Sequence, residues 1–344
     1  MTKKSSKTIL ITGGYGFIGS NFVRHLLTTH PEYHVVNLDL LTYAGNPDNL
    51  RDLEGSPRYQ FIQGDICNRQ LLDRFFKKTA FSAVIHFAAE THVDRSIINV
   101  SDFIRTNVEG TRTMIEAVRA HHVPRFVHIS TDEIYGDVSK GRSREHSPLR
   151  PSNPYSASKA AADLLVQSFM RTHQIPALIV RGSNNYGPYQ YPEKLIPLAV
   201  TNLLSGKKIP VHGDGTHIRS WLHVQDFCNA IDLVMHRAPL FSIYNVSGEE
   251  KTDMEMLKMI ANHLGKNIDN HKKYVNDRPG ADIRYAVAAE KLKKELGWRP
   301  KFTLRKSIPD VIRWYEANSP WWENIRKRKD FLDHYKKQAR GQWF

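Results

Sequence analysis

The chain is poor in cysteine, with only Cys67 and Cys228 among 344 residues. The two are far apart and lack metal-ligand spacing. We therefore expect neither a disulfide framework nor a zinc site, and no bound metal. A reducing compartment, the cytoplasm, is the expected location.

Long hydrophobic runs are also missing. The first apolar run, residues 8–12, is too short for the hydrophobic core of a signal peptide, and glycines follow it directly. No stretch is long enough to cross a bilayer, so we expect no membrane segment. Because 40% of the residues are hydrophobic, the chain can still build a full-sized core in one large or two closely joined domains.

Acidic residues are outnumbered, 35 against 49 basic ones, which gives a net charge of +14. Lys3, Lys4 and Lys7, together with a basic tail that starts at about residue 326, supply eight of these charges. We interpret them as solvated ends that aid solubility. The alternative is a basic nucleic-acid-binding protein, which no recognised nucleic-acid motif supports, so we consider nucleic acid an unlikely partner.

Short apolar segments alternate with amphipathic segments through the first half of the chain. The apolar segments predict strands at Lys7–Thr12, Val35–Asp39, Tyr59–Gln63, Ala83–Phe87, Phe126–Ser130 and Ala177–Arg181. The amphipathic segments predict helices at Phe17–Thr28, Leu71–Lys78, Phe103–His121 and Tyr155–His173. This order is typical of the α/β class, and we expect a Rossmann-type doubly wound parallel sheet with helices on both faces.

A glycine-rich turn joins the first predicted strand to the first predicted helix. Gly14, Gly16 and Gly19 fit G-x-G-x-x-G, while Gly13, Gly16 and Gly19 fit G-x-x-G-x-x-G. In this context glycines let the backbone reach a pyrophosphate, and the helix N-terminus attracts its charge. Asp39 ends the second strand, where a carboxylate binds a ribose 2′-hydroxyl and repels a 2′-phosphate, so NAD is favoured over NADP.

Composition changes after Tyr186, where proline and glycine become frequent and the predicted elements shorten. We expect a smaller mixed α/β C-terminal lobe for the substrate. The predicted division is an NAD-binding Rossmann domain at 1–186 and a lobe at 187–344, the two being interleaved. Leu304–Asn318 looks helical, and Pro309 should kink this helix or mark its true first turn.

Polar side chains with acid–base chemistry follow the strand at 126–130. Thr131, Asp132 and Glu133 place a hydroxyl beside two carboxylates, at a strand end where open α/β sheets keep their ligands. Tyr155 and Lys159 are four residues apart on a predicted helix and share a face. A cation about 4 Å away supplies about 4 kcal/mol at an effective dielectric of about 20, enough to bring a tyrosine pKa from about 10 to about 7. We expect Lys159 to do this, helped by a positive nicotinamide.

These residues and several longer runs resemble the extended short-chain dehydrogenase/reductase superfamily, and within it the dTDP-glucose 4,6-dehydratases. The resemblance extends from residue 8 to about residue 300. The matching runs are residues 12–19, 41–46, 88–96, 130–136, 153–159, 183–188, 192–197 and 277–280.

The resemblance implies a hydro-lyase that converts dTDP-glucose to its 4-keto-6-deoxy derivative. Tyr155 would take the proton of the 4-hydroxyl while hydride leaves C4 for NAD, and Thr131 would hydrogen-bond that oxygen. Glu133 would remove the C5 proton, and Asp132 would protonate the departing 6-hydroxyl. Hydride would then return to C6, so NAD should stay tightly bound and be regenerated in each cycle.

The cofactor and substrate residues are predicted from these motifs and from the resemblance. For NAD they are Gly13, Gly16, Phe17, Ile18, Gly19, Asp39, Leu41, Thr42, Asp65, Ile66, Phe87, Ala88, Ala89, Thr106, Tyr155, Lys159 and Asn185. For the nucleotide-sugar they are Thr91, Thr131, Asn184, Lys194, Leu195, Pro210, His212, Arg219, Asp277 and Arg278.

Four departures from the family pattern lie in the substrate lobe, at His212, Ser220, Met254 and Ala281. The nucleotide therefore stays open: thymidine is our prediction, with uridine or another base as alternatives. A nucleotide-sugar epimerase or decarboxylase would share the cofactor site and Tyr155, but it would not need the acid pair. The remote alternative is a non-catalytic nucleic-acid-binding protein on this fold.

The superfamily resemblance also implies a homodimer. The predicted helices at 103–121 and 155–173 resemble those that pair two subunits as a four-helix bundle.

Overall fold

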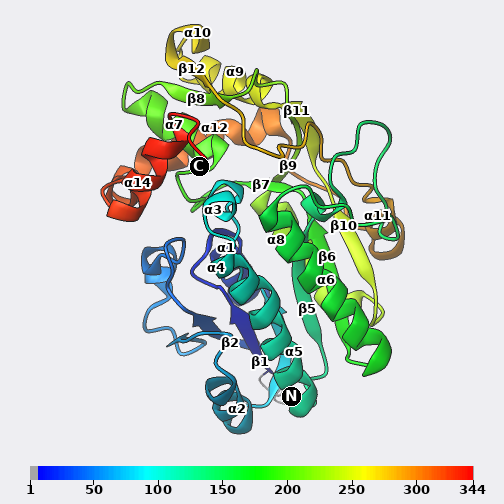
Figure 1. Cartoon of the computed structure of the whole chain (residues 1–344). Helices are drawn as coiled ribbons and strands as arrows, with labels where there is room; N and C mark the ends of the chain where they lie inside the picture. The colour runs from blue at the N-terminus through cyan, green and yellow to red at the C-terminus, as the bar shows by residue number, and fades with distance from the viewer. Residues whose placement is uncertain (1–6, 344) are drawn as a thin grey trace.

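A seven-stranded parallel sheet organises the structure, a computed structural model that describes residues 7–343 (Figure 1). The strand order is β10-β6-β5-β4-β1-β2-β3. The strands are β1 (Lys7–Thr12), β2 (Tyr33–Asp39), β3 (Tyr59–Gln63), β4 (Phe81–His86), β5 (Phe126–Thr131), β6 (Ala177–Gly182) and β10 (Ile243–Val246). The first six confirm the predicted strands, and the α/β doubly wound class is confirmed.

The direction of winding reverses between β1 and β4. The chain runs from β1 outward to β2 and β3, then returns to β4 on the other side of β1 and continues outward to β5 and β6. In open α/β sheets ligands bind at such a reversal, beyond the carboxyl ends of the strands. The topology therefore places the expected site above β1 and β4.

Two helical layers cover the sheet, since side chains along each strand point alternately to its two faces. Ile9 and Ile11 pack toward one layer, and Leu10 packs toward the other. The first layer contains α1 (Phe17–Thr29), α8 (Val224–Arg237) and α11 (Glu290–Leu296). The second contains α2 (Arg69–Lys78), α5 (Thr111–Ala120) and α6 (Pro154–Thr172).

The predicted helix at 103–121 is divided in the structure. A short α4 (Ser101–Phe103) leads into a π-helical segment, Ile104–Gly110, and α5 follows. Within the π segment the buried Asn107 bonds both backbone groups of Glu90 and donates to Ser158 Oγ at 2.8 Å. This polar contact ties the segment to α6 and to the loop that follows β4, and π-helical turns are frequent at functional sites.

The C-terminal half builds a smaller lobe with two small sheets and its own core (Figure 1). One sheet has β7 (Asn184–Tyr186), β9 (Ile218–His223) and β11 (Glu249–Thr252), and the other has β8 (Ile209–His212) and β12 (Lys272–Val275). Its longer helices are α7 (Leu195–Leu204), α9 (Asp253–His263), α12 (Leu304–Ala317), α13 (Ser319–Arg326) and α14 (Lys329–Gln338). The lobes interleave, because α8, β10 and α11 come from this half yet pack in the large sheet's layers.

Short helical turns occupy the connections. They are the 3₁₀ turns Pro47–Leu53 and Asp132–Tyr135 and the helices α3 (Val93–Ile98) and α10 (Ile268–His271). Among residues 7–343 no helix has the length and apolar character needed to cross a membrane.

The basic tail is not simply a solvated end, which corrects the sequence interpretation. Phe331, His334, Gln338 and Trp343 are buried, and α14 packs onto the smaller lobe. The charged side chains interleaved with these residues face solvent, as does Leu332. The sequence signal was misleading because lysines hid the apolar spacing of the helix.

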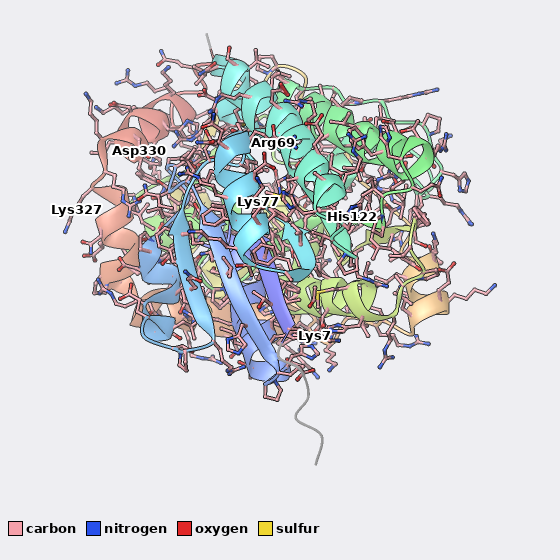
Figure 2. All side chains as sticks on the ribbon, turned by 90° about the horizontal axis from the view of Figure 1, so that it is seen from below. Lys7, Arg69, Lys77, His122, Lys327 and Asp330 are labelled. Carbon is pink, nitrogen blue, oxygen red and sulfur yellow. The ribbon has the colours of Figure 1, made fainter. Side chains whose placement is uncertain are left out.

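The two charged ends do not meet on the surface. Figure 2 shows Lys7, at the start of β1, well separated from Lys327 and Asp330 near α14. The predicted positions Lys3 and Lys4 lie outside the described residues. Within the described part of the chain, the basic ends thus form no common patch.

Pro309 does not begin its helix, contrary to one of the two outcomes predicted for it. The helix α12 starts at Leu304 and continues through the proline to Ala317. Burial of Leu304, Ile308, Val311, Ile312 and Tyr315 in the smaller core offsets the missing backbone hydrogen bond.

A buried ion pair joins the sheet to α6. Arg181 on β6 donates from Nε and Nη2 to the two oxygens of Asp163 at 2.9 and 2.7 Å, and both side chains are almost fully buried. Truncating one partner of such a pair leaves an uncompensated charge in the core.

We predict that Asp163→Ala lowers the free energy of unfolding by about 3–5 kcal/mol, measured by chemical denaturation. Asp310→Ala removes the exposed partner of Arg313 and should change it by less than about 1 kcal/mol. Equal changes in the free energy of unfolding for the two variants would contradict a stabilising role for the buried Arg181–Asp163 pair.

Candidate functional site

Two adjoining cavities lie beyond the carboxyl ends of the strands, where the topology predicts a site. The larger has a volume of about 280 Å³ and the smaller about 140 Å³. They share the lining residues Glu133, Asn184, Asn185, Gln190 and Lys194. A ligand with two different ends can therefore span from the large sheet to the smaller lobe.

The glycine turn is shaped for close approach. Gly13 has a φ of +73°, and a Cβ there would lie 2.7 Å from the Ala88 amide nitrogen. A Cβ on Gly19 would lie 2.2 Å from the Gly13 carbonyl oxygen. No side chain caps the N-terminus of α1, so its first amides are left for an anion. This cradle fits the pyrophosphate of a dinucleotide.

Asp39 stands at the end of β2 in the wall of the larger cavity. Its carboxylate accepts hydrogen bonds from the Tyr15 and Leu41 amides at 2.9 and 2.8 Å, which fixes its orientation. Burial raises the pKa of Asp39, and these two hydrogen bonds oppose that rise. A fixed carboxylate here fits the ribose hydroxyl of NAD.

The structure brings nearly all predicted cofactor residues to one cavity. Those lining it are Gly13, Gly16, Phe17, Ile18, Gly19, Asp39, Thr42, Asp65, Ile66, Phe87, Ala88, Ala89, Thr106, Tyr155, Lys159 and Asn185. Leu41 is the exception: it does not line the cavity, and its only link to the site is the hydrogen bond that its backbone amide donates to Asp39.

The start of α6 holds Tyr155 and Lys159 in the same cavity. Asn153 and Ser156 form a capping box there, and Pro154 takes the first helical position, which suits proline. Lys159 Nζ donates to the Ile129 carbonyl at 2.7 Å, and burial lowers the pKa of Lys159 to about 8.

The expected lowering of the Tyr155 pKa is absent in the protein alone. Burial raises the pKa of Tyr155 above its ordinary value, Glu133 and Asp132 raise it further, and a hydrogen bond with Thr131 lowers it. The lysine charge alone predicts a lower pKa for Tyr155, but the cost of burying a phenolate outweighs it.

The acid pair lies in a tight turn directly after β5. Thr131 caps the 3₁₀ turn Asp132–Tyr135 by accepting a hydrogen bond from the Glu133 amide. Gly136 ends the turn at a φ of +73°, and a Cβ there would lie 2.1 Å from the Arg150 carbonyl oxygen. The turn therefore presents both carboxyl groups to the cavity.

The two carboxyl groups differ in their surroundings. Asp132 is buried, and burial together with the charge of Glu133 raises its pKa well above the ordinary value. Burial also raises the pKa of Glu133, but Lys194, Arg219 and Arg278 favour its anion. One oxygen of each, Asp132 Oδ2 and Glu133 Oε2, is buried without a hydrogen-bond partner. Such an arrangement suits an acid next to a base.

Three cations gather around the smaller cavity. Lys194 Nζ donates to the Thr91 carbonyl at 3.1 Å, Arg219 donates to the Asp282 carbonyl at 2.9 Å, and Arg278 lies 3.5 Å from Asp94. Such donors suit the phosphates of a nucleoside diphosphate.

Most predicted substrate residues line one of the two cavities. They are Thr91, Thr131, Asn184, Lys194, Leu195, Pro210, His212, Arg219 and Arg278. Asp277 is not brought to the wall; it lies 2.9 Å from His217 Nε2 and accepts from the Arg278 amide.

The C-terminal tail supplies residues that sequence reasoning missed. Gln338 lines the smaller cavity, and its amide nitrogen faces two acceptors, Asp94 Oδ2 at 3.3 Å and the Glu193 carbonyl at 3.1 Å. Its carbonyl oxygen is left buried and unpartnered. The Trp343 ring lies 5.3 Å from the His212 ring, so the tail closes this end of the site. No motif in the basic tail could have signalled this.

Glu90 is a second residue that was missed. It lines the larger cavity, and burial raises its pKa to about 7. The signal was present, because Glu90 lies inside the run 88–96 that carries the family resemblance.

Comparisons with known proteins agree with this geometry. The family described as GDP-mannose 4,6 dehydratase matches residues 10–311. The dTDP-glucose 4,6-dehydratase of Streptomyces niveus is 45% identical over 323 residues, covering 92% of this chain and 95% of that protein.

Solved structures give the same result. The dTDP-glucose 4,6-dehydratase of Bacillus anthracis in complex with NAD is 44% identical, with a TM-score of 0.87, covering 93% of this chain and 99% of that one. The dTDP-glucose 4,6-dehydratase of Streptomyces venezuelae, with NAD bound, is 44% identical with a TM-score of 0.90, covering 92% and 99%.

We predict that Gly19→Ala weakens NAD binding by about tenfold to 100-fold, since the added carbon overpacks the turn by about 1–3 kcal/mol. Calorimetric titration of NAD into cofactor-free protein measures the loss. Gly55→Ala is the control: its φ of +84° makes alanine strained there too, but a Cβ meets no atom within 4 Å and Gly55 does not line the cavity, so NAD affinity should not change. Unchanged affinity in the Gly19 variant would contradict the cradle.

Proposed function

This chain belongs to the GDP-mannose 4,6 dehydratase family, and from that premise we propose that it is a hydro-lyase that converts dTDP-glucose to dTDP-4-keto-6-deoxyglucose. The observation on which this depends is the acid pair, buried Asp132 and half-buried Glu133, beside Tyr155 in the cavity that fits NAD. Bound NAD supplies the acceptor for hydride from C4 and the source of hydride for C6.

Tyr155 takes the proton of the 4-hydroxyl, and the Thr131 hydroxyl bonds the same oxygen. For this step the phenol must ionise, although burial opposes it in the protein alone. The positive nicotinamide and the Lys159 ammonium both favour the phenolate. Proton removal is therefore coupled to cofactor binding.

In the elimination step one carboxyl group accepts a proton and the other donates one. The new 4-ketone acidifies C5, and Glu133 accepts the C5 proton with the help of the nearby cations. The C5–H electrons form the C5–C6 double bond, the C6–O bond breaks, and the proton of Asp132 completes the departing water. Glu133 returns its proton to C5 when C6 is reduced.

The nucleotide end belongs to the smaller cavity. Lys194, Arg219 and Arg278 bind the diphosphate, and His212 and Gln338 lie at the base end. A sugar-nucleotide epimerase needs the same Tyr155, but its reaction eliminates no water and therefore does not require Asp132 and Glu133. UDP-glucose is the alternative substrate that the departures at His212 and Ala281 keep open.

The direct test supplies dTDP-glucose and UDP-glucose separately to the purified protein without added NAD. We expect a 4-keto-6-deoxy product from dTDP-glucose, with UDP-glucose turned over more slowly. A C4 epimer without loss of water would refute the dehydratase assignment, and binding of nucleic acid without turnover would refute catalysis altogether.

A homodimer is the proposed assembly. The helices α5 and α6 lie together in the outer layer of the large domain, with Ile104 before α5 and Leu164 on α6 exposed (Figure 1). Pairing these helices with those of a second copy would cover the apolar side chains. A monomer by light scattering would contradict this assembly.

A cytoplasmic location is proposed on the cysteines. Neither Cys67 nor Cys228 forms a disulfide, and Cys228 is buried.

We predict that Glu133→Gln lowers kcat by about 100-fold or more, while substrate affinity and the first hydride transfer remain. Reduced nicotinamide should accumulate in single-turnover absorbance measurements, because C5 stays protonated. Equal loss of hydride transfer and product formation would contradict the role of Glu133.

We predict that Gln338→Ala raises KM for dTDP-glucose by roughly threefold to tenfold, the value of one hydrogen bond, with kcat nearly unchanged. Steady-state kinetics measures both constants, and Lys337→Ala, which alters the exposed neighbour, is the control. An unchanged KM would show that Gln338 in the tail does not contribute to substrate binding.

A further inference from the structure

Four side chains with metal-binding chemistry converge away from the two cavities. His25 lies on α1, His30 follows the end of α1, and Asp232 and His236 are one turn apart on α8. The ends of α1 and α8 adjoin the starts of β2 and β10, so this cluster lies at the amino edge of the parallel sheet. The site described above occupies the carboxyl edge, and none of the four residues lines either cavity.

The three imidazoles all face one carboxylate. His25 Nε2 lies 2.8 Å from Asp232 Oδ2, His30 Nε2 lies 3.0 Å from Oδ1, and His236 Nδ1 lies 2.7 Å from Oδ1. The ligand atoms of His30, Asp232 and His236 all lie within 4.8 Å of one another. The side chains are 11–32% exposed, so an ion can reach them from solvent.

The elements that hold the cluster are rigid. Asp232 and His236 share a face of α8 through their i, i+4 spacing, and α1 packs against α8. The second ring nitrogen of His236 lies 2.6 Å from the Tyr33 hydroxyl, the kind of outer contact that orients a metal-binding histidine. Neutral imidazoles with one carboxylate suit zinc and similar transition metals, whereas Mg²⁺ and Ca²⁺ prefer oxygen alone.

A second group of three possible ligands in the described residues is less suited to a cation. His92, Asp94 and His334 are buried together, but Asp94 already faces Arg278, and the adjoining Glu193 pairs with Arg95 at 2.9 Å. These arginines already balance the carboxylates. Around Asp232 the facing partners are imidazoles, which can exchange a proton for a metal.

We propose that His30, Asp232 and His236 bind one divalent transition-metal ion of the zinc type at the edge of the sheet remote from the active site, with His25 holding the other oxygen of Asp232 and so joining α1 to α8. Binding replaces the protons on the ring nitrogens that face the metal: a neutral ring carries its proton on the other nitrogen instead, and a protonated ring releases one proton to solvent. The ion stabilises the fold and takes no part in dehydration.

The test uses full-length protein treated with a chelator and then titrated with ZnCl₂ or MgCl₂. We expect one Zn²⁺ per chain by calorimetry and a rise of several degrees in Tm with Zn²⁺ but not with Mg²⁺. His236→Gln and His30→Gln should each weaken Zn²⁺ binding by at least about tenfold and abolish the Tm rise.

Two matched variants separate this site from other histidines. His263→Gln alters an exposed histidine on α9, and His334→Gln disables the buried group beside the substrate cavity. Both should bind Zn²⁺ at the cluster like the unaltered protein. Co²⁺ provides a second readout that does not depend on variant stability, since a site of this kind gives visible ligand-field absorption that His236→Gln should lose.

The absence of a stoichiometric site, or Zn²⁺ binding that persists in both His236→Gln and His30→Gln, would overturn the proposal. Loss of binding in His334→Gln alone would place the ion elsewhere and overturn it as well. None of these measurements depends on the dehydratase assignment.

Discussion

The constraint on which the site depends is the placing of two neighbouring carboxyl groups, buried Asp132 and half-buried Glu133, at the end of β5. Asp132 and Glu133 each have an oxygen without a partner, a costly arrangement in a protein interior. It persists because Gly136 and the Thr131 cap fix the turn and because Lys194, Arg219 and Arg278 favour the anion of Glu133. Strand β5 thus ends in two carboxyl groups with different surroundings, since the charge of Glu133 raises the pKa of Asp132 while cations oppose the rise at Glu133.

The two lobes contribute different parts of the site around Asp132 and Glu133. The parallel sheet supplies the glycine cradle and Asp39 on one side, and the smaller lobe supplies cations on the other. The two lobes are joined by interleaving, because β10 and α8 from the second half of the chain complete the sheet and the helical layer of the first half. The tail closes one end of the smaller cavity, where Gln338 lines the wall and Trp343 packs against His212.

Local patterns in the sequence predicted the strands up to β6, because each buried strand is a continuous apolar run, and the helices α1, α2, α5, α6 and α12, apart from the division at 101–110. They also predicted the glycine turn and the acid pair, whose positions follow from strand ends. They did not predict α7, α8, α9 or α13. The missed features depend on distant contacts: β10 is short and gains its place by pairing with β6, and α14 is recognisable only from what it covers. Burial likewise reversed the expected Tyr155 pKa, since a charge count alone omits desolvation.

The central claim is that one tightly held nicotinamide takes hydride from C4 and gives it to C6 of the same sugar. It is tested by supplying dTDP-glucose that carries deuterium at C4 and carbon-13 in its glucose ring, together with an equal amount of unlabelled substrate, and locating the deuterium among carbon-13-labelled and unlabelled products by mass spectrometry and NMR. The account predicts deuterium in the C6 methyl group of labelled molecules alone. Loss of the label to solvent, or its transfer to the unlabelled sugar, would contradict it.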